Sequence, residues 1–297
     1  MDKEAEVQST ANPPVPAGGC LTIVATPIGN LEDLSPRARQ TLADADRILV
    51  EDRRHAQKLF HSMGLHPRTE IFHEHNERQQ IPKILQYLRN GEKLAMISDA
   101  GMPLVSDPGF PLVATLRAEN IPVTVVPGPN AALSALVLSG LPSDRFCFEG
   151  FLPARKGARC RKLETLVQEE RTLIFYEAPH RILETLEDME SIFGGDRPAV
   201  LCRELTKIHE ECCGNCIGDI LHDFRRSPER LRGEMTLVVG GGEQESPGME
   251  TVDRLLRPLL SELPLAQAVR LAEAQSGLSH RVLYQRALSL TSLGSSD

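Results

Sequence analysis

Short apolar runs alternate with longer segments of mixed polarity through the first half of the chain. The apolar runs are rich in Val, Ile and Leu and predict buried strands, while the longer segments have the spacing of amphipathic helices. Such alternation is typical of α/β units in which helices join parallel strands. We therefore predict an α/β fold whose first lobe has strands at 21–26, 47–51, near Ile71, at 93–98 and at 123–126.

Capping residues indicate where the helices of this lobe begin and end. Ser35 directly before Pro36 predicts a helix start, and Gly64 predicts the end of the next helix. Asn76 followed by Gln79 resembles a capping box and predicts another start. Further starts are predicted at Asp107-Pro108 and Asn130, and further ends at Gly91, Asn120 and Gly140.

The second half of the chain contains a second α/β lobe and a helical tail. Its strands are predicted at 146–151, 171–177, 198–203 and 234–239, and three short helices follow at 252–263, 265–275 and 280–290. The last two helices, joined across Gly277 with Ser279 as the predicted N-cap, resemble a helix-turn-helix, although such pairs are more often plain packing modules. We predict a disordered tail at 1–19, an N-terminal lobe at 20–127, a C-terminal lobe at 128–243, a linker at 244–250 and a helical module at 251–297.

The segment 93–109 is the best candidate for a ligand-binding loop. A mostly apolar strand run breaks at Asp99 into a loop that contains Gly101 and Gly109, two prolines and a second aspartate. Glycine lets the backbone approach a ligand closely, and ligands of α/β sheets bind beyond the carboxyl ends of the strands. We therefore expect a small ligand to bind at this loop.

Charge and composition limit the partners. The net charge of −8 argues against indiscriminate binding to nucleic acids, but a local basic stretch follows the strand predicted at 146–151. This stretch is either a solvated helix face or an RNA contact. Its five basic residues are Arg155, Lys156, Arg159, Arg161 and Lys162.

Cysteine content and hydropathy favour a cytoplasmic protein. Seven cysteines without a regular framework, in a chain large enough to bury a core, predict free thiols in a reducing compartment. No apolar run reaches the length of a membrane span, and the N-terminal residues lack the apolar core of a signal peptide.

Other motifs carry weaker signals. The Gly240-Gly241-Gly242 triplet lacks the spacing of a dinucleotide-binding loop. His73 and His75 would share one face of an extended segment, and Cys212, Cys213 and Cys216 have the spacing of half a zinc knuckle, but neither set is complete. We expect no metal site.

Seven segments between residues 25 and 211 resemble the bacterial 16S rRNA 2′-O-ribose cytidine methyltransferase I family. The match as a whole spans about residues 20 to 290, in order, and includes the terminal helix pair. This family belongs to the tetrapyrrole-methylase-like class of S-adenosylmethionine enzymes. The segments are ATPIGNLEDLSPRA (25–38), EDRRH (51–55), SDAGMPLVSDPGF (98–110), PGPNAALSAL (127–136), SGLPSDRFCFEGFLP (139–153), TLIFYEAPHR (172–181) and RELTKIHEE (203–211).

The resemblance implies an enzyme that binds S-adenosylmethionine in a cleft between two α/β lobes. It also implies a homodimer that methylates cytidine 1402 of 16S rRNA, a target within the small ribosomal subunit. The cofactor-binding residues that it implies are Pro27, Ile28, Gly29, Asp99, Gly101, Met102, Pro103, Asn130, Ala131 and Tyr176.

Two titratable residues near strand ends of the second lobe are candidates for accepting the proton of the attacking hydroxyl. They are His180 in YEAPHR and Lys207 in RELTK. The alternative is that His180 caps its helix and that Lys207 only contacts phosphate.

The chain departs from the family pattern at three positions. Arg53 replaces the usual Thr of E-D-T-R-H, Asn130 replaces a small hydroxyl residue or Cys, and Met235 replaces a frequent aromatic. Of these, we expect only Arg53 to lie near the site.

The sequence is also compatible with two other functions. The same fold could methylate a tetrapyrrole or another small molecule, because fold does not fix substrate. The chain could also be a non-catalytic RNA-binding ribosome factor, although the intact glycine-rich and proline-rich loops argue against a decayed pocket. The basic stretch and the helical tail favour RNA as the substrate.

Overall fold

The first sheet is parallel, as predicted. The computed structural model describes residues 18–242, 249–276, 278 and 280–293, so most of the predicted tail and linker, with Gly277 and Ser279, lies outside the described residues. The strand order is β3-β2-β4-β1-β5 and every pairing in it is parallel. The strands are β1 (Cys20–Val24), β2 (Arg47–Val50), β3 (Thr69–Ile71), β4 (Lys93–Met96) and β5 (Val123–Val126).

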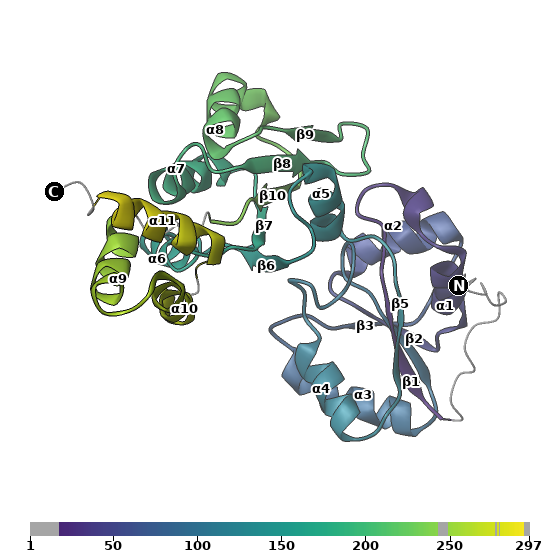
Figure 1. The fold of residues 1–297 in the computed structure, drawn as a ribbon. Coiled ribbons are helices and arrows are strands. Elements are labelled where there is room, and N and C mark those ends of the chain that lie inside the picture. The colour runs from purple at the N-terminus through teal and green to yellow at the C-terminus, as the bar shows by residue number, and fades with distance from the viewer. Residues whose placement is uncertain (1–17, 243–248, 277, 279, 294–297) are drawn as a thin grey trace, which may run out of the picture. The chain divides into compact units, whose positions relative to one another are not determined.

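Helices cover both faces of this sheet (Figure 1). The helices α1 (Pro36–Asp44) and α2 (Arg53–Met63) pack on one face around Ile48 and Val50. On the other face, α3 (Glu77–Arg89) and α4 (Phe110–Ala118) pack around residues such as Leu49 and Met96. Burial on both faces explains why these strands are continuous apolar runs rather than alternating ones.

Most of the predicted helix ends are confirmed, and two are wrong. The Ser35 hydroxyl accepts a hydrogen bond from the Ala38 amide, and Gly64 ends α2 in the left-handed region with φ of 69°. The Asn76 side chain does not cap α3, because it accepts from the His73 amide and donates to the Ile71 carbonyl. The helix predicted at Asp107-Pro108 begins at Phe110, since the preceding loop extends to Gly109.

The second sheet has mixed directions, with strand order β6-β7-β10-β8-β9. Its last strand in sequence, β10, lies between β7 and β8 and runs antiparallel to both. A short strand that the sequence reasoning missed, β9, forms the edge. The strands are β6 (Phe146–Phe151), β7 (Thr172–Glu177), β8 (Ala199–Arg203), β9 (Glu211–Cys213) and β10 (Met235–Val239).

Helix α5 (Ala131–Ser139) packs on one face of the second sheet, where Ala135 and Leu136 contact apolar residues of β7, β8 and β10. The other face packs against α6 (Lys156–Glu164), α7 (Ile182–Phe193) and α8 (Ile217–Arg226). The α/β fold class is therefore confirmed.

The chain separates into two compact units, Met1–Gly241 and Gly242–Asp297. Both sheets belong to the first unit, and the boundary of the lobes at 127 and 128 stays a prediction. Among the described residues, no helix combines the length and apolar character needed to cross a membrane.

The C-terminal unit consists, in its described part, of α9 (Met249–Glu262), α10 (Leu265–Ser276) and α11 (His280–Leu293). Its core contains Leu256, Val269 and Leu283. The Arg286 guanidinium donates two hydrogen bonds to Asp253, at 2.6 and 2.7 Å, and so ties α11 to α9. A bidentate pair of this kind fixes orientation as well as adding energy.

Candidate active site

Two loops meet at the carboxyl ends of the neighbouring strands β1 and β4. Thr26 donates its amide hydrogen to the Gly101 carbonyl at 2.9 Å, and the Gly101 amide donates to the Thr26 carbonyl at 3.1 Å. Thr26 is buried, with 1% of its surface exposed. This bridge holds the 27–29 turn against the 99–103 loop, so the structure brings together the two segments that the sequence singled out separately.

The loop from Ile97 to Gly109 has an unusual backbone. Gly101 has φ of 78°, but the non-glycine residues Leu104 and Ser106 also have positive φ, at 71° and 66°. Such conformations cost on the order of 1 kcal/mol each and cluster at ligand-binding segments. Met102 and Leu104 pack on the core of the first sheet, which holds the loop in this form.

A cavity of about 380 Å³ opens beside these loops and is lined by them and by residues of the second sheet. Ligand pockets typically start at about 300 Å³. Six of the ten predicted cofactor-binding residues line it: Ile28, Asp99, Gly101, Met102, Ala131 and Tyr176.

The four others lie near this cavity without lining it. Pro27 and Gly29 line a neighbouring cavity of about 440 Å³, which shares Ile28, Asp99, Ala100 and Glu234 with the first. Pro103 is buried in the loop, and the Asn130 side chain caps α5 by accepting from the Leu133 amide at 3.0 Å. Asn130 therefore positions Ala131 at the cavity.

Several residues that the sequence reasoning missed also line the cavity. Phe151 is 56% exposed and its ring centroid is 5.6 Å from that of Tyr176, so the two rings form an aromatic wall. The segment 233–236 comes from the beginning of β10, and antiparallel pairing brings this beginning beside the ends of β7 and β8. The missed residues are Ala100, Val105, Ser106, Asp107, Phe151, Glu177, Ala178, Pro179, Gly233, Glu234, Met235 and Thr236.

The expectation about the departures from the family pattern needs correction. Met235 lines the 380 Å³ cavity, whereas Arg53 lines a different cavity on α2. The departure nearest the site is therefore Met235.

Carboxyl groups gather at the ends of β2 and β4. Burial raises the pKa of Glu51 to about 7, and the negative charges of Asp107 and Asp99 add to this effect. Burial likewise raises the pKa of Asp107 to about 6. Asp99 stays partly exposed and contacts Nδ1 of His55 at 2.8 Å. A pocket edged by carboxyl groups favours a cationic ligand over an anionic one.

The raised pKa of Glu51 predicts a pH-dependent stability. Between about pH 4.5 and 7 the unfolded chain loses this proton while the folded chain keeps it, so the free energy of unfolding falls as pH rises. Glu51→Gln removes the titrating carboxyl group and with it this fall in the free energy of unfolding. An unscreened shift of this size corresponds to about 3 kcal/mol, and because Glu51 is only partly buried we expect the variant's gain over the wild type to grow through that window to about 2 kcal/mol, measured by urea unfolding. The exposed Glu74→Gln is the control, and a pH-independent gain would contradict burial as the cause.

The two predicted proton acceptors lie in different surroundings. His180 is exposed in the turn after β7, directly following the cavity residues Ala178 and Pro179 but not lining the cavity itself. Lys207 Nζ contacts carboxylate oxygens of Glu204 at 2.8 Å and Glu234 at 3.2 Å. Burial by itself would lower the pKa of Lys207, but the two carboxylates have the larger combined effect, so the pKa is raised above its ordinary value. A lysine held protonated cannot accept a proton.

Lys207 also marks a close contact between the two lobes. A Cβ added to Gly29 would come within 2.4 Å of Cγ of Lys207 and 2.9 Å of the Leu205 carbonyl oxygen. The Thr206 hydroxyl accepts a hydrogen bond from the Asn30 amide at 3.1 Å. The 27–29 turn thus contacts the second lobe directly.

The basic stretch lies at the start of α6, and one of its five members needs correction. The Arg159 side chain is 1% exposed, and its Nε donates to the buried Asp188 at 2.7 Å. It also donates to Glu184 and to the Ala154 carbonyl, so it cannot reach a phosphate without breaking these bonds. The sequence alone suggests a surface position for Arg159, because the carboxylates that bind it are more than twenty residues away along the chain.

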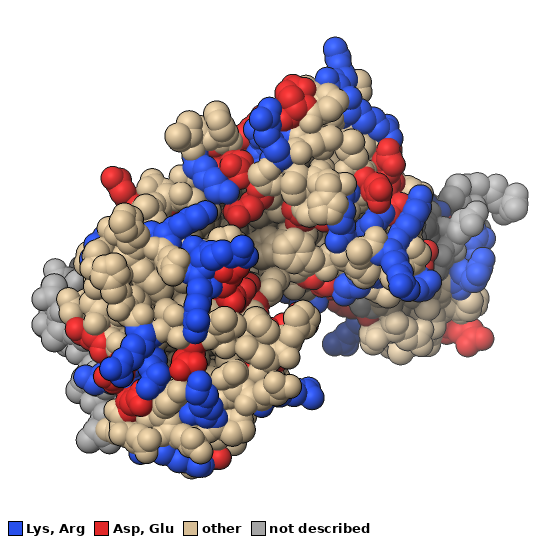
Figure 2. Space-filling model, turned by 180° about the vertical axis from the view of Figure 1, so that it is seen from behind, with Lys and Arg blue, Asp and Glu red and all other residues tan. Residues whose placement is uncertain are grey.

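The four other residues of the stretch are at the surface. Arg155, Lys156 and Arg161 are exposed, while Lys162 is half-buried and contacts Glu149 at 2.7 Å. Figure 2 shows basic side chains scattered among acidic and uncharged ones over one face of the molecule, without one continuous basic surface on that face.

Comparisons with known proteins agree with this geometry. The family model described as Tetrapyrrole (Corrin/Porphyrin) Methylases matches residues 20–218, and the model described as RsmI C-terminal HTH domain matches residues 246–291. A protein of Pseudomonas aeruginosa named ribosomal RNA small subunit methyltransferase I is 47% identical over 277 residues, covering 92% of this chain and 98% of its own length. A protein of the same name from Escherichia coli O157:H7 is 45% identical, covering 91% and 95%.

Solved structures share the fold at lower identity. The methyltransferase CobJ superposes with a TM-score of 0.55 at 17% identity, over 75% of this chain and 94% of its own. A uroporphyrin-III C-methyl transferase from Thermus thermophilus, complexed with S-adenyl homocysteine, gives 0.50 at 18% identity, over 76% and 98%.

Proposed function

Because this chain belongs to the ribosomal RNA small subunit methyltransferase I family, within the tetrapyrrole methylases, we propose that it methylates the ribose 2′-hydroxyl of cytidine 1402 in 16S rRNA, with S-adenosylmethionine as donor. The observation that carries the proposal is the cavity of about 380 Å³ between the joined strand-end loops and the aromatic wall of the second lobe.

The residues present fit S-adenosylmethionine. Gly101 presents backbone without a side chain, and Tyr176 and Phe151 give flat apolar contacts. Asp99 and Asp107 supply negative charge beside a cofactor that carries positive charge on its sulfonium and amino groups. The bound cofactor supplies an electrophilic methyl group.

The protein's contribution to the reaction is mainly alignment and exclusion of water. The Thr26–Gly101 bridge fixes one wall of the cavity, and the aromatic wall fixes the other. Holding reactants in line can supply a large share of a rate enhancement. The protonated Lys207, held by Glu204 and Glu234 at the cavity rim, can pair with an RNA phosphate or hold Glu234 in place. His180, exposed in the turn directly after the cavity residues Ala178 and Pro179, remains the candidate proton acceptor.

The direct test is methyl transfer in vitro. The purified chain, S-adenosylmethionine and small ribosomal subunits from a strain lacking this modification should yield 2′-O-methylcytidine, located at 1402 by primer extension. Free 16S rRNA in a parallel reaction tells whether the assembled subunit is required. Methylation of a uroporphyrinogen instead would favour the small-molecule alternative. Cofactor binding without transfer to any of these substrates would favour a non-catalytic ribosome factor.

We also propose that the chain is a cytoplasmic homodimer. The edge strand β5 and the following helix α5 carry apolar side chains that are about half exposed or more. They are Val125, Leu133, Val137 and Leu138, at 53%, 49%, 78% and 50%. Exposed apolar side chains on neighbouring elements are typical of a protein interface. Val137→Glu should shift the mass measured by light scattering from dimer to monomer.

The exposed members of the basic stretch are proposed to contact the RNA backbone. Each lost phosphate contact lowers the slope of log affinity against log salt by about 0.7 for single strands. Replacing Arg155, Lys156 and Arg161 with Ala should therefore reduce the slope by about 2 and weaken RNA binding, with cofactor affinity unchanged. Fluorescence anisotropy of a labelled 16S rRNA fragment measures both quantities. An unchanged slope would identify the stretch as a solvated helix face.

The C-terminal helical module is proposed to help hold the rRNA. On α11 the side chains of Val282, Tyr284 and Leu288 are exposed, and the Tyr284 ring stacks on that of His280. Exposed aromatic rings offer stacking surfaces for unpaired bases. Removal of residues 251–297 should leave cofactor affinity unchanged and lower methylation of subunits at least tenfold. A truncated chain that methylates as well as the full chain would give the module a structural role only.

A further inference from the structure

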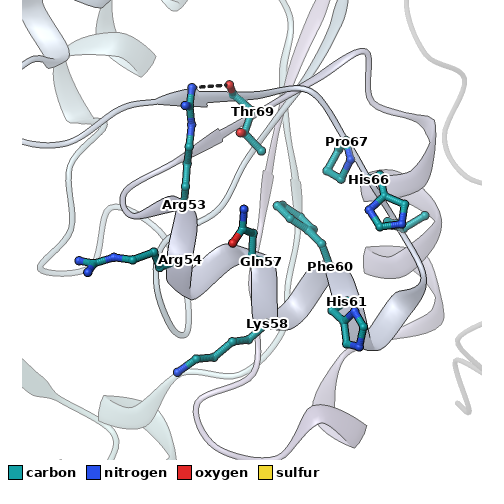
Figure 3. Close-up of a pocket in the computed structure, with 10 residues that line it drawn as sticks. Arg53, Arg54, Gln57, Lys58, Phe60, His61, His66, Pro67 and Thr69 are labelled. Carbon is teal, nitrogen blue, oxygen red and sulfur yellow. Dashed lines mark hydrogen bonds between the residues drawn. The ribbon is translucent and has the colours of Figure 1, made fainter.

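A third cavity, of about 590 Å³, lies on the N-terminal lobe. It is formed between α2 and the chain that leads from α2 into β3, and Figure 3 shows its lining side chains. Phe60 is buried at 4% exposure and, with the half-buried Leu65 and Pro67, gives the cavity a firm apolar base. The other lining residues are Arg53, Arg54, Gln57, Lys58, His61, His66 and Thr69.

The charge of this cavity is entirely positive. Three lining residues are permanently cationic, two are histidines, and none is acidic. Among the residues that the structure describes, Arg54 alone of these cations has a carboxylate partner, Asp52 at 3.0 Å. The Arg53 guanidinium donates to the Thr69 carbonyl at 3.3 Å, which leaves its other N–H groups available. Lys58, His61 and His66 form no side-chain hydrogen bond or ion pair within the described part of the chain.

Unpaired cations gathered around an apolar base favour an anionic ligand. The chain as a whole is acidic, so their grouping here is not a result of composition. Arg53, Gln57 and His61 recur every fourth residue on α2, about 6 Å apart along the helix axis. This row offers several donors in succession, which matches a ligand with repeated anionic groups better than a single phosphate ion.

The position of the cavity connects it with the active site. Lys58 lines both this cavity and the 440 Å³ cavity beside the 27–29 turn. That cavity in turn shares Asp99, Ala100 and Glu234 with the 380 Å³ cavity. The three cavities therefore follow one another along the first unit, from the proposed site of methyl transfer to α2.

We propose that the α2 cavity binds backbone phosphates of the rRNA strand that continues from the target nucleotide. This inference rests on the proposed function and adds a second RNA contact, on the opposite lobe from the basic stretch of α6. Arginine donates to phosphate oxygens through several N–H groups, and lysine acts as a point charge. The phosphates would then fix the register of the strand while the cavity of about 380 Å³ holds the cofactor.

The test compares charge removal with charge retention. Arg53→Gln with Lys58→Gln should lower the salt slope for a labelled oligoribonucleotide around cytidine 1402 by about 1.4 and weaken binding about tenfold at low salt. Arg53→Lys with Lys58→Arg keeps the charge and should bind like the wild type. Arg78→Ala with Arg117→Ala removes two exposed cations of α3 and α4, on the other face of the same sheet, and should change neither quantity.

Further measurements separate the outcomes. Equal melting temperature and cofactor affinity in all variants would exclude damage to the fold. If the wild type binds and methylates the RNA but the Gln variant keeps its affinity and slope, the α2 cavity is not an RNA contact, although the proposed function stands. If the wild type neither binds nor methylates the RNA, both proposals fail. A competition experiment adds inorganic phosphate at the same concentration of phosphate groups as the oligoribonucleotide contains. If it displaces the oligoribonucleotide, the cavity binds single phosphate ions and the proposed contact with the strand is overturned.

Discussion

Gly101→Val is expected to abolish cofactor binding. A Cβ at this position would lie 3.2 Å from Cγ2 of Ile28, and the two further carbons of Val would extend into the space that the cofactor needs. The two hydrogen bonds to Thr26 prevent the backbone from moving aside. Calorimetric titration with S-adenosylmethionine should show an affinity at least about 100-fold weaker, or about 2.7 kcal/mol.

A matched variant separates loss of binding from loss of fold. Gly101 has φ of 78°, so any side chain there costs about 1 to 2 kcal/mol. Gly91 has φ of 89° in the turn before β4, and a Cβ there would meet no atom within 4 Å. Gly91→Val therefore has a similar backbone cost away from the cavity, and it should bind the cofactor normally. Retained affinity in Gly101→Val would remove this loop from the binding site.

Arg159→Ala is expected to cause the largest loss of stability among the single variants considered. Its removal leaves the Asp188 carboxylate, 5% exposed, with Lys156 at 3.5 Å as its one remaining cation among the described residues. Breaking a buried ion pair on one side typically costs 3 to 5 kcal/mol, so we expect about 3 kcal/mol by urea unfolding. The exposed neighbour Arg161→Ala should change stability by less than about 0.5 kcal/mol. Equal effects of the two substitutions would contradict the buried role of Arg159.

Local patterns in the sequence predicted the first lobe well. Its strands, the Ser35 cap and the glycine end of α2, like the Asn130 cap of α5 in the next lobe, depend on residues within four positions of one another. The Asn76 capping box failed because the same side chain found partners in the preceding turn, at His73 and Ile71. A short polar side chain can satisfy either arrangement, and tertiary context chooses.

The site was predicted only where it follows strand ends. Asp99, Gly101 and Met102 come directly after an apolar strand, which signals a ligand loop. Glu234 and Met235 come at the start of a strand, and no local signal reveals that β10 runs antiparallel and brings them to the same edge. The prediction that Arg159 contacts RNA failed for a similar reason, because its partner Asp188 is distant in sequence.

The central position of β10 also bears on how the chain folds during synthesis. All five strands of the first sheet lie within residues 20–126, so this sheet can complete its pairing early, as N-terminal segments do when they leave the ribosome first. The second sheet cannot, because β7 and β8 have no strand between them until residues 235–239 emerge. The nascent protein therefore leaves the facing edges of β7 and β8 unpaired from the synthesis of each strand until residues 235–239 follow. Strand β10 then pairs with both edges and completes the lining of the 380 Å³ cavity in one step.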